Sequence, residues 1–171
     1  LKAAPTPFIE ADGDPDVDPR GVLQADACKI LMKVLCAARV SRYDLPGAVG
    51  ALASRVATWT ATCDAKLCRM MCYIYGSTET RLKGYVGDPA SALELTLYSD
   101  ADFVGCKTTR RSTSGIFLAL TDPNTWRLLT AVSKKQTCVS HSTPEAELVA
   151  MDAAVRTAGP PALNLWETIL Q

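Results

Sequence analysis

The stretch Leu95-Thr96-Leu97-Tyr98-Ser99-Asp100-Ala101-Asp102-Phe103-Val104-Gly105 decides how the second half of this chain folds. Its first residues alternate between apolar and polar, which predicts a β-strand with Leu95 and Leu97 on one face. Two carboxylates, Asp100 and Asp102, follow just before a glycine turn. A strand that ends in an aspartate can hold a metal ligand in a fixed position. The alternative is that both aspartates only solubilise the strand end or cap the turn.

The composition is that of a globular protein with one sizeable core. The chain has 171 residues, of which 48% are hydrophobic, and its 18 basic and 18 acidic residues give no formal net charge. The charge is unevenly distributed, because residues 1–18 hold five acidic residues and one basic residue. The remaining chain therefore has 17 basic against 13 acidic residues, which is compatible with a polyanionic partner but does not require one.

The cysteines and the apolar runs bear on location. Seven cysteines, an odd number without the dense spacing of a disulfide scaffold, indicate a reducing compartment. No signal peptide and no apolar run of membrane length are evident, so we expect an intracellular protein, cytoplasmic or nuclear, that does not enter a membrane. The spacing of Cys63, Cys68 and Cys72 fits no zinc motif, and buried thiols on a helix are the better interpretation.

The order of patterns predicts an α+β fold with three regions. Residues 1–20, rich in proline and aspartate, are expected to be a disordered leader. Residues 21–90 form a helical segment, because apolar residues recur with helical period over 23–40, 45–59 and 62–75, the second helix capped by Asp44. Residues 91–171 hold the strands 94–99, 114–121 and 126–133 and a covering helix, after an earlier strand at 81–86. This predicts antiparallel hairpins under a helix, with a last short helix over 162–170.

The covering helix carries the second carboxylate of interest. Thr143 is the expected N-cap, Pro144 the first helical residue, and Gly159-Pro160-Pro161 the end. Glu147 precedes Met151 and Val155 at helical spacing, so we expect its carboxylate on the face that packs against the sheet. Paired with Asp100, it would form half of a two-metal site. The alternative is that Glu147 only favours the helix N-terminus.

At these residues the sequence resembles the ribonuclease H region of copia-type retrotransposon polyproteins. The resemblance covers residues 94–170 and is carried by four ordered motifs: Tyr98-Ser99-Asp100-Ala101-Asp102-Phe103-Val104-Gly105, Arg111-Ser112-Thr113-Ser114-Gly115, Ser133-Lys134-Lys135-Gln136 and Ser142-Thr143-Pro144-Glu145-Ala146-Glu147. A looser resemblance upstream is to the segment that connects the polymerase to the ribonuclease H domain. The resemblance implies a ribonuclease H-like mixed sheet whose later strands are absent.

The resemblance also implies roles for particular residues. Asp100 and Glu147 would be the catalytic carboxylates and would bind Mg²⁺ or Mn²⁺, with Asp102 and Glu145 as the runners-up. The expected substrate is an RNA–DNA hybrid and the expected partner a reverse transcriptase domain. The candidate nucleic-acid contacts are Arg110, Arg111, Lys134, Lys135 and Gln136, for each of which a solvated surface position is an equal alternative.

The end of the chain departs from that family pattern. Two further aspartates of the family would lie beyond Gln171, so the chain is expected to be a fragment or a separately encoded remnant with an incomplete site. The absent strand would leave the Leu95–Asp100 edge open. The rival hypothesis is therefore a catalytically inactive remnant that binds nucleic acid or associates with itself through this edge. A relic without any function is a third hypothesis.

Overall fold

A computed structural model describes residues 2–9, 18–106 and 109–170 of the chain. It confirms the α+β class and divides the chain into two compact units, Leu1–Leu82 and Lys83–Gln171. The division falls earlier than the boundary expected between residues 90 and 91. No helix in the described part of the chain combines the length and apolarity needed to span a membrane.

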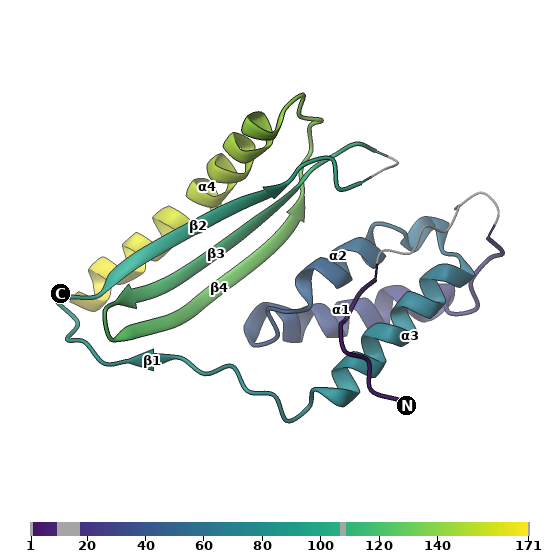
Figure 1. Ribbon diagram of the computed structural model, residues 1–171, viewed down its shortest axis with the longest axis horizontal. Coiled ribbons are helices and arrows are strands. Elements are labelled where there is room, and N and C mark those ends of the chain that lie inside the picture. The colour runs from purple at the N-terminus through teal and green to yellow at the C-terminus, as the bar shows by residue number, and fades with distance from the viewer. Residues whose placement is uncertain (1, 10–17, 107–108, 171) are drawn as a thin grey trace. The chain divides into compact units, whose positions relative to one another are not determined.

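The first unit consists of helices (Figure 1). They are α1 (Gln24–Val40), α2 (Pro46–Ala53), a 3₁₀ turn η1 (Val56–Thr58) and α3 (Ala61–Gly76). Their apolar stripes meet in one core, whose largest fully buried side chains are Trp59, Leu31, Leu45, Leu52, Leu67, Met70 and Val49. The predicted second helix is therefore interrupted, since α2 ends at Ala53 and only the short turn continues the pattern.

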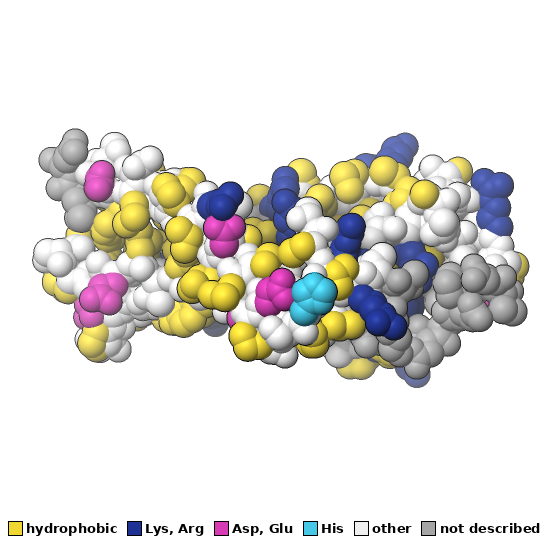
Figure 2. Space-filling model, turned by 90° about the horizontal axis from the view of Figure 1, so that it is seen from above, with side chains coloured by type: hydrophobic (Ala, Val, Ile, Leu, Met, Phe, Trp, Pro, Cys, Tyr) yellow, Lys and Arg dark blue, Asp and Glu magenta, His cyan; other side chains and the backbone are white. Residues whose placement is uncertain are grey.

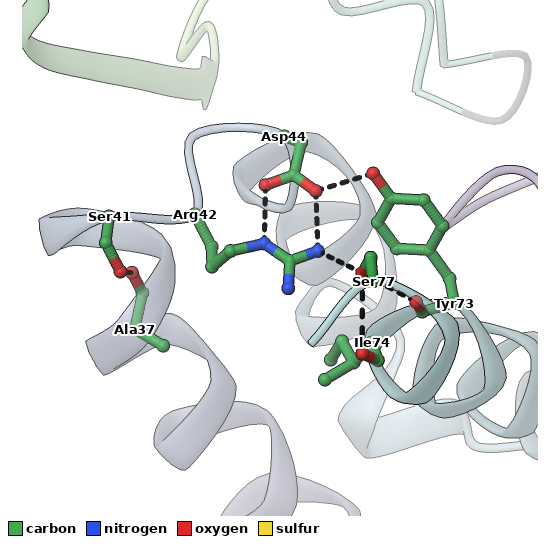
Figure 3. A network of polar contacts seen from close by, with 7 residues as sticks. All are labelled: Ala37, Ser41, Arg42, Asp44, Tyr73, Ile74 and Ser77. Atoms are coloured by element: carbon green, nitrogen blue, oxygen red, sulfur yellow. Dashed lines mark hydrogen bonds and ion pairs between the residues drawn. The ribbon is translucent and has the colours of Figure 1, made fainter. Parts of the chain in front are cut away.

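Two aspartates hold this unit together in ways that the sequence pattern did not predict. Asp44, expected as the cap of α2, instead forms an ion pair with Arg42 at 2.8 Å and accepts a hydrogen bond of 2.7 Å from the Tyr73 hydroxyl (Figure 3). Asp64 of α3 accepts hydrogen bonds from the backbone N–H groups of Val22 and Leu23, at 2.6 and 3.1 Å. Because α1 has no side-chain cap of its own, Asp64 supplies that cap from another helix.

The described parts of the leader contact the helices. Phe8 packs on the helical core, Arg69 donates a hydrogen bond of 2.9 Å to Thr6, and Arg20 pairs with Thr60 in an isolated bridge. The remaining leader residues, 1 and 10–17, lie outside the described part of the chain. The three cysteines of α3 are not all buried either: Cys63 is, whereas Cys68 is exposed.

The second unit is an antiparallel sheet with one helix on its face (Figure 1). Its strands are β1 (Tyr85–Val86), β2 (Glu94–Asp102), β3 (Thr113–Asp122) and β4 (Thr125–Lys135), in the order β1-β4-β3-β2. The predicted strand at 81–86 shrinks to two residues. A bulge in β4 lies opposite the junction of Leu118 and Ala119, which pair with Thr130 and Leu128.

A single helix, α4 (Thr143–Leu170), covers β2 and β3. The helix was expected to end at Gly159-Pro160-Pro161 and to be followed by a separate one, but it continues through both prolines. Its start is capped one residue earlier than predicted, by a variant of the capping box in which the glutamate reaches the residue before the N-cap. Ser142 accepts a hydrogen bond from the N–H of Glu145 at 3.3 Å, and the Glu145 carboxylate accepts one from the N–H of His141 at 2.7 Å.

Candidate binding edge of the sheet

The site is built on β2, a nine-residue strand at the edge of the sheet. Each of its residues from Glu94 to Asp102 pairs with β3 on one side. In an antiparallel sheet every second residue points its N–H and C=O away from that neighbour. In the described part of the chain no other backbone segment pairs with these outward groups. The edge is therefore able to accept a further strand.

A pocket of about 250 Å³ runs beside this edge, between the sheet and the second half of α4. The sheet supplies Leu95, Leu97 and Leu118, and the helix supplies Val155, Gly159, Ala162 and Leu163. The lining is predominantly apolar. The alternation of β2 places its two leucines on the helix side. Leu95 and Leu97 are only half-buried at the edge, so an added strand would bring its own side chains into contact with them.

The helix extends this apolar surface. Leu148, Met151 and Val155 lie at helical spacing and leave 60%, 51% and 53% of their surface exposed. Figure 2 shows hydrophobic side chains gathered over the part of the molecule where Figure 1 places α4. Val155 belongs both to this row and to the pocket, so exposed apolar surface continues from the pocket along α4. We call this surface the β2–α4 groove.

The packing of α4 explains why these larger residues remain exposed. The helix contacts the sheet through the buried alanines 146, 150, 154 and 158, which pack on Ala101 and Ile116. Their small side chains let the helix approach the sheet closely. The prediction that Glu147, Met151 and Val155 form the buried stripe is wrong, because that stripe lies about 100° around the helix from the alanines.

The opposite face of β2 carries charge. Glu94, Asp100 and Asp102 are all exposed and, being an even number of residues apart, lie on the same face. Within the part of the chain that the structure describes, none of the three forms an ion pair. Tyr98 lies between them and packs edge-on against Phe117, with ring centroids 6.0 Å apart.

This alternation also places the predicted metal ligands. Ala101 packs against α4, so the side chain of the preceding residue, Asp100, points to the other face of the sheet. Glu147 lies on α4, next to the buried Ala146, on the covered side. Among the described residues no group of three or more His, Cys, Asp or Glu side chains could hold a metal ion. The metal-binding and catalytic roles of Asp100 and Glu147 remain predictions.

The predicted nucleic-acid contacts lie at one end of the sheet. Arg110 and Arg111 are exposed in the loop between β2 and β3, and Lys134 is exposed at the end of β4. Gln136 is not available to a phosphate, because it is only 5% exposed. Its amide donates hydrogen bonds of 3.0 Å to Ser114 Oγ and 2.9 Å to the carbonyl of Ala146, and its oxygen accepts one from Ser140. Gln136 therefore joins β3 to the first turn of α4.

Cys106 is a chemically distinctive residue that the sequence pattern did not indicate. Partial burial acts to raise the pKa of its thiol, but hydrogen bonds from Lys135 and Thr109 and the charge of Lys135 outweigh this and lower the pKa to about 6. Sequence reasoning missed it because Lys135 is distant along the chain and reaches Cys106 only through the fold. The assignment of Lys135 to a phosphate contact overlooked this neighbour.

A comparison with known proteins decides the family. The chain is 37% identical over 131 residues to secreted RxLR effector protein 161 of Plasmopara viticola, a match that covers 76% of this chain and 82% of that protein. This chain belongs to the family of that effector. No protein-family profile and no solved structure matches the chain.

Membership in this effector family corrects several predictions. The assignment to copia-type retrotransposon polyproteins is wrong, and so are the ribonuclease H function and the inactive-remnant alternative that followed from it, because the relative is named a secreted effector. The intracellular location is contradicted by the same name. The motif around Ser142 and Glu145 has a structural explanation, since these residues form the capping box of α4. Short motifs of this kind recur wherever a helix needs a cap.

Proposed function

We propose that this chain is a secreted effector-type protein that acts by binding another protein, one extended segment of which adds to the free edge of β2. The location and the effector character are carried over from the relative's name. The observation that carries the binding mode is the β2 edge with the β2–α4 groove beside it. Strand addition gains main-chain hydrogen bonds from the edge and side-chain contacts from the pocket.

The exposed apolar surface supports a binding role. Natural sheets protect long edge strands with inward-pointing charges, prolines or bulges, and β2 has none of these on its helix side. Exposed apolar surface that continues along a free edge is typical of an interaction site. A bound strand would cover Leu95, Leu97 and Val155 together.

Location can be tested separately from binding. We expect the protein, detected with a specific antibody, in the medium around the cells that produce it and not in the washed cell fraction. Retention of all protein in the cell fraction would contradict the secreted location and leave the binding mode to the next experiment.

Binding can be tested with displayed random peptides of nine residues, the length of β2. We expect selected peptides to alternate apolar residues, and expect Ser99→Lys and Val155→Asp to abolish selection, since both place a charge on the helix side of the edge. Thr137→Lys and Thr157→Asp add the same charges at exposed positions away from the groove and should leave selection intact. Equal selection by all four variants would refute the site.

A further inference from the structure

We infer that the segment bound at β2 alternates apolar residues with basic ones, the basic residues facing the carboxylates of Glu94, Asp100 and Asp102. This inference rests on the proposed strand addition and specifies the chemistry of the partner. It follows from the two unlike faces of β2, one apolar and the other acidic. A strand added beside β2 continues both faces, since its side chains also alternate.

The helix side of the added strand must be apolar. There the partner meets Leu95, Leu97 and the pocket wall formed by Val155 and Leu163. A charged side chain placed there would lose its hydration without gaining a partner, because the pocket lining offers no counter-charge. Branched aliphatic residues at alternate positions fit this side.

The other side of the added strand must neutralise negative charge. Glu94 lies near one end of β2, and Asp100 and Asp102 lie near the other, all exposed. The charge of Glu94 is also felt by Asp122, whose pKa is raised by partial burial and then by the charges of Asp88 and Glu94. Lysine or arginine opposite these positions would gain attraction, whereas acidic residues would add like-charge repulsion directly across the pair.

The same charges disfavour a second copy of β2 as the occupant. If two copies paired antiparallel about Tyr98, Glu94 of one copy would face Asp102 of the other, and Asp100 would face Thr96. No basic residue of either β2 strand would offset these carboxylates. Charge complementarity therefore favours a foreign basic segment over self-pairing of β2.

The test uses synthetic nine-residue peptides and the full chain. The first peptide has lysine at its first, third, seventh and ninth positions, valine or leucine at the even positions and threonine at the fifth. The second has glutamate in place of each lysine, and the third has the composition of the first in an order that breaks the alternation. Lysines at positions 1, 7 and 9 lie opposite Glu94, Asp100 and Asp102 if the peptide runs parallel to β2, and those at positions 9, 3 and 1 do so if it runs antiparallel.

Titration calorimetry should show the lysine peptide binding about tenfold or more tightly than the glutamate peptide. Its affinity should fall several-fold when the salt is raised from about 50 to about 300 mM. The double variant Asp100→Asn with Asp102→Asn should weaken the lysine peptide by about three- to tenfold. Glu79→Gln, an exposed carboxylate of the helical unit, should have no effect.

The other outcomes are distinguishable. Equal binding of the lysine and glutamate peptides would overturn the basic-partner inference while leaving strand addition in place. If the scrambled peptide binds as tightly as the lysine peptide, charge attraction alone explains the binding. That result would also overturn the basic-partner inference. If no peptide binds and the chain stays monomeric in analytical ultracentrifugation, the proposed binding mode itself fails. A concentration-dependent increase in mass that Ser99→Lys abolishes would make a second copy the occupant.

Discussion

At the scale of single residues, the thiol of Cys106 differs from an ordinary cysteine. Because its pKa is lowered to about 6, most of it is thiolate at pH 7, and thiolates are the reactive form. We expect iodoacetamide to modify Cys106 at a rate that levels off above about pH 7, whereas the urea-unfolded chain should show an ordinary midpoint near 8.5. Mass spectrometry of the modified peptides measures both.

The control for this prediction is Lys135→Gln, which removes the charge and keeps a hydrogen-bond donor. The midpoint of Cys106 should then move upward, because the thiolate loses the positive charge of Lys135. If the pH profile of Cys106 in the folded chain matches that of the unfolded chain, the contact with Lys135 does not act on this thiol.

Gln136 has a structural role, because its amide makes buried hydrogen bonds. We expect Gln136→Met, which is similar in shape, to reduce the free energy of unfolding by about 1–3 kcal/mol. The substitution leaves Ser114 Oγ and the carbonyl of Ala146 without their donor in a buried place. Urea unfolding followed by circular dichroism measures the loss. Thr137→Met, at the exposed neighbouring position, should change little, and an equal loss in both variants would contradict the buried role.

At the scale of elements, α4 continues through two prolines that destabilise a helix. Pro160 and Pro161 lack the N–H groups that would bond the carbonyls of Arg156 and Thr157, and interior prolines destabilise a helix by about 3 kcal/mol. Ala162 and Leu163, beyond the prolines, line the same pocket as Leu95 and Leu97, so the continuation of the helix stays beside the sheet. The sequence pattern could not predict this, because proline is a local stop signal and the sheet that overrides it is a tertiary contact.

Replacing both prolines by alanine should therefore stabilise the second unit. We expect a gain of about 1–3 kcal/mol in the free energy of unfolding, measured from thermal and urea transitions. Pro144→Ala is the matched control, since proline in the first turn of a helix is favourable and its loss should bring no gain. A loss of stability in the double variant would mean that the prolines themselves favour the fit of α4 to the sheet.

Periodicity predicted the type of most elements correctly, but the site less well. Helices at 24–40 and 61–76 and strands on both sides of the Asp122-Pro123-Asn124 turn follow from local spacing. Local spacing did not predict which stripe of α4 is buried. The alanines and the Met151–Val155 row have the same period, and only contact with the sheet distinguishes them. The open edge along Leu95–Asp100 was expected only from the family resemblance, because strand order is a property of the whole sheet and not of local spacing.

The cysteine count misled the prediction of location. All seven cysteines are free, as the spacing indicated. Yet pairing of cysteines reports the redox conditions that a protein experiences and its need for cross-links, not the route by which it leaves a cell. A chain with two hydrophobic cores gains enough burial to fold without disulfides.

At the scale of the whole molecule, acid should weaken the helical unit. In the helical unit, partial burial acts to raise the pKa of Asp44 and Asp64, but hydrogen bonds from Arg42 and Tyr73 and from Trp59, Val22 and Leu23 outweigh it, and both pKa values are lowered. A carboxyl with a lowered folded-state pKa stabilises above its unfolded value, near 4, and loses that contribution as the pH falls through the folded value.

We therefore expect the helical unit to lose stability as the pH falls below about 4. Fluorescence of Trp59, which donates a 2.6 Å hydrogen bond to Asp64, reports on this unit in a Trp126→Phe, Trp166→Phe background. Asp64→Asn should flatten the dependence of the unfolding free energy on pH. Asp26→Asn, at an exposed position in the first turn of α1, should not. If both substitutions flatten the pH dependence equally, protonation of carboxylates in general, and not the Asp64 cap, causes the loss of stability.

The bulge in β4 has a consequence for how substitutions along this strand are tolerated. Trp126 contacts Phe117 on the face away from α4, whereas Val132 pairs with Ile116 and so shares its face toward α4. Odd and even positions therefore exchange faces at the inserted residue, Leu129. In a saturation scan of β4, the stability of the variants should alternate between sensitive and tolerant positions. This alternation should shift by one residue at Leu129.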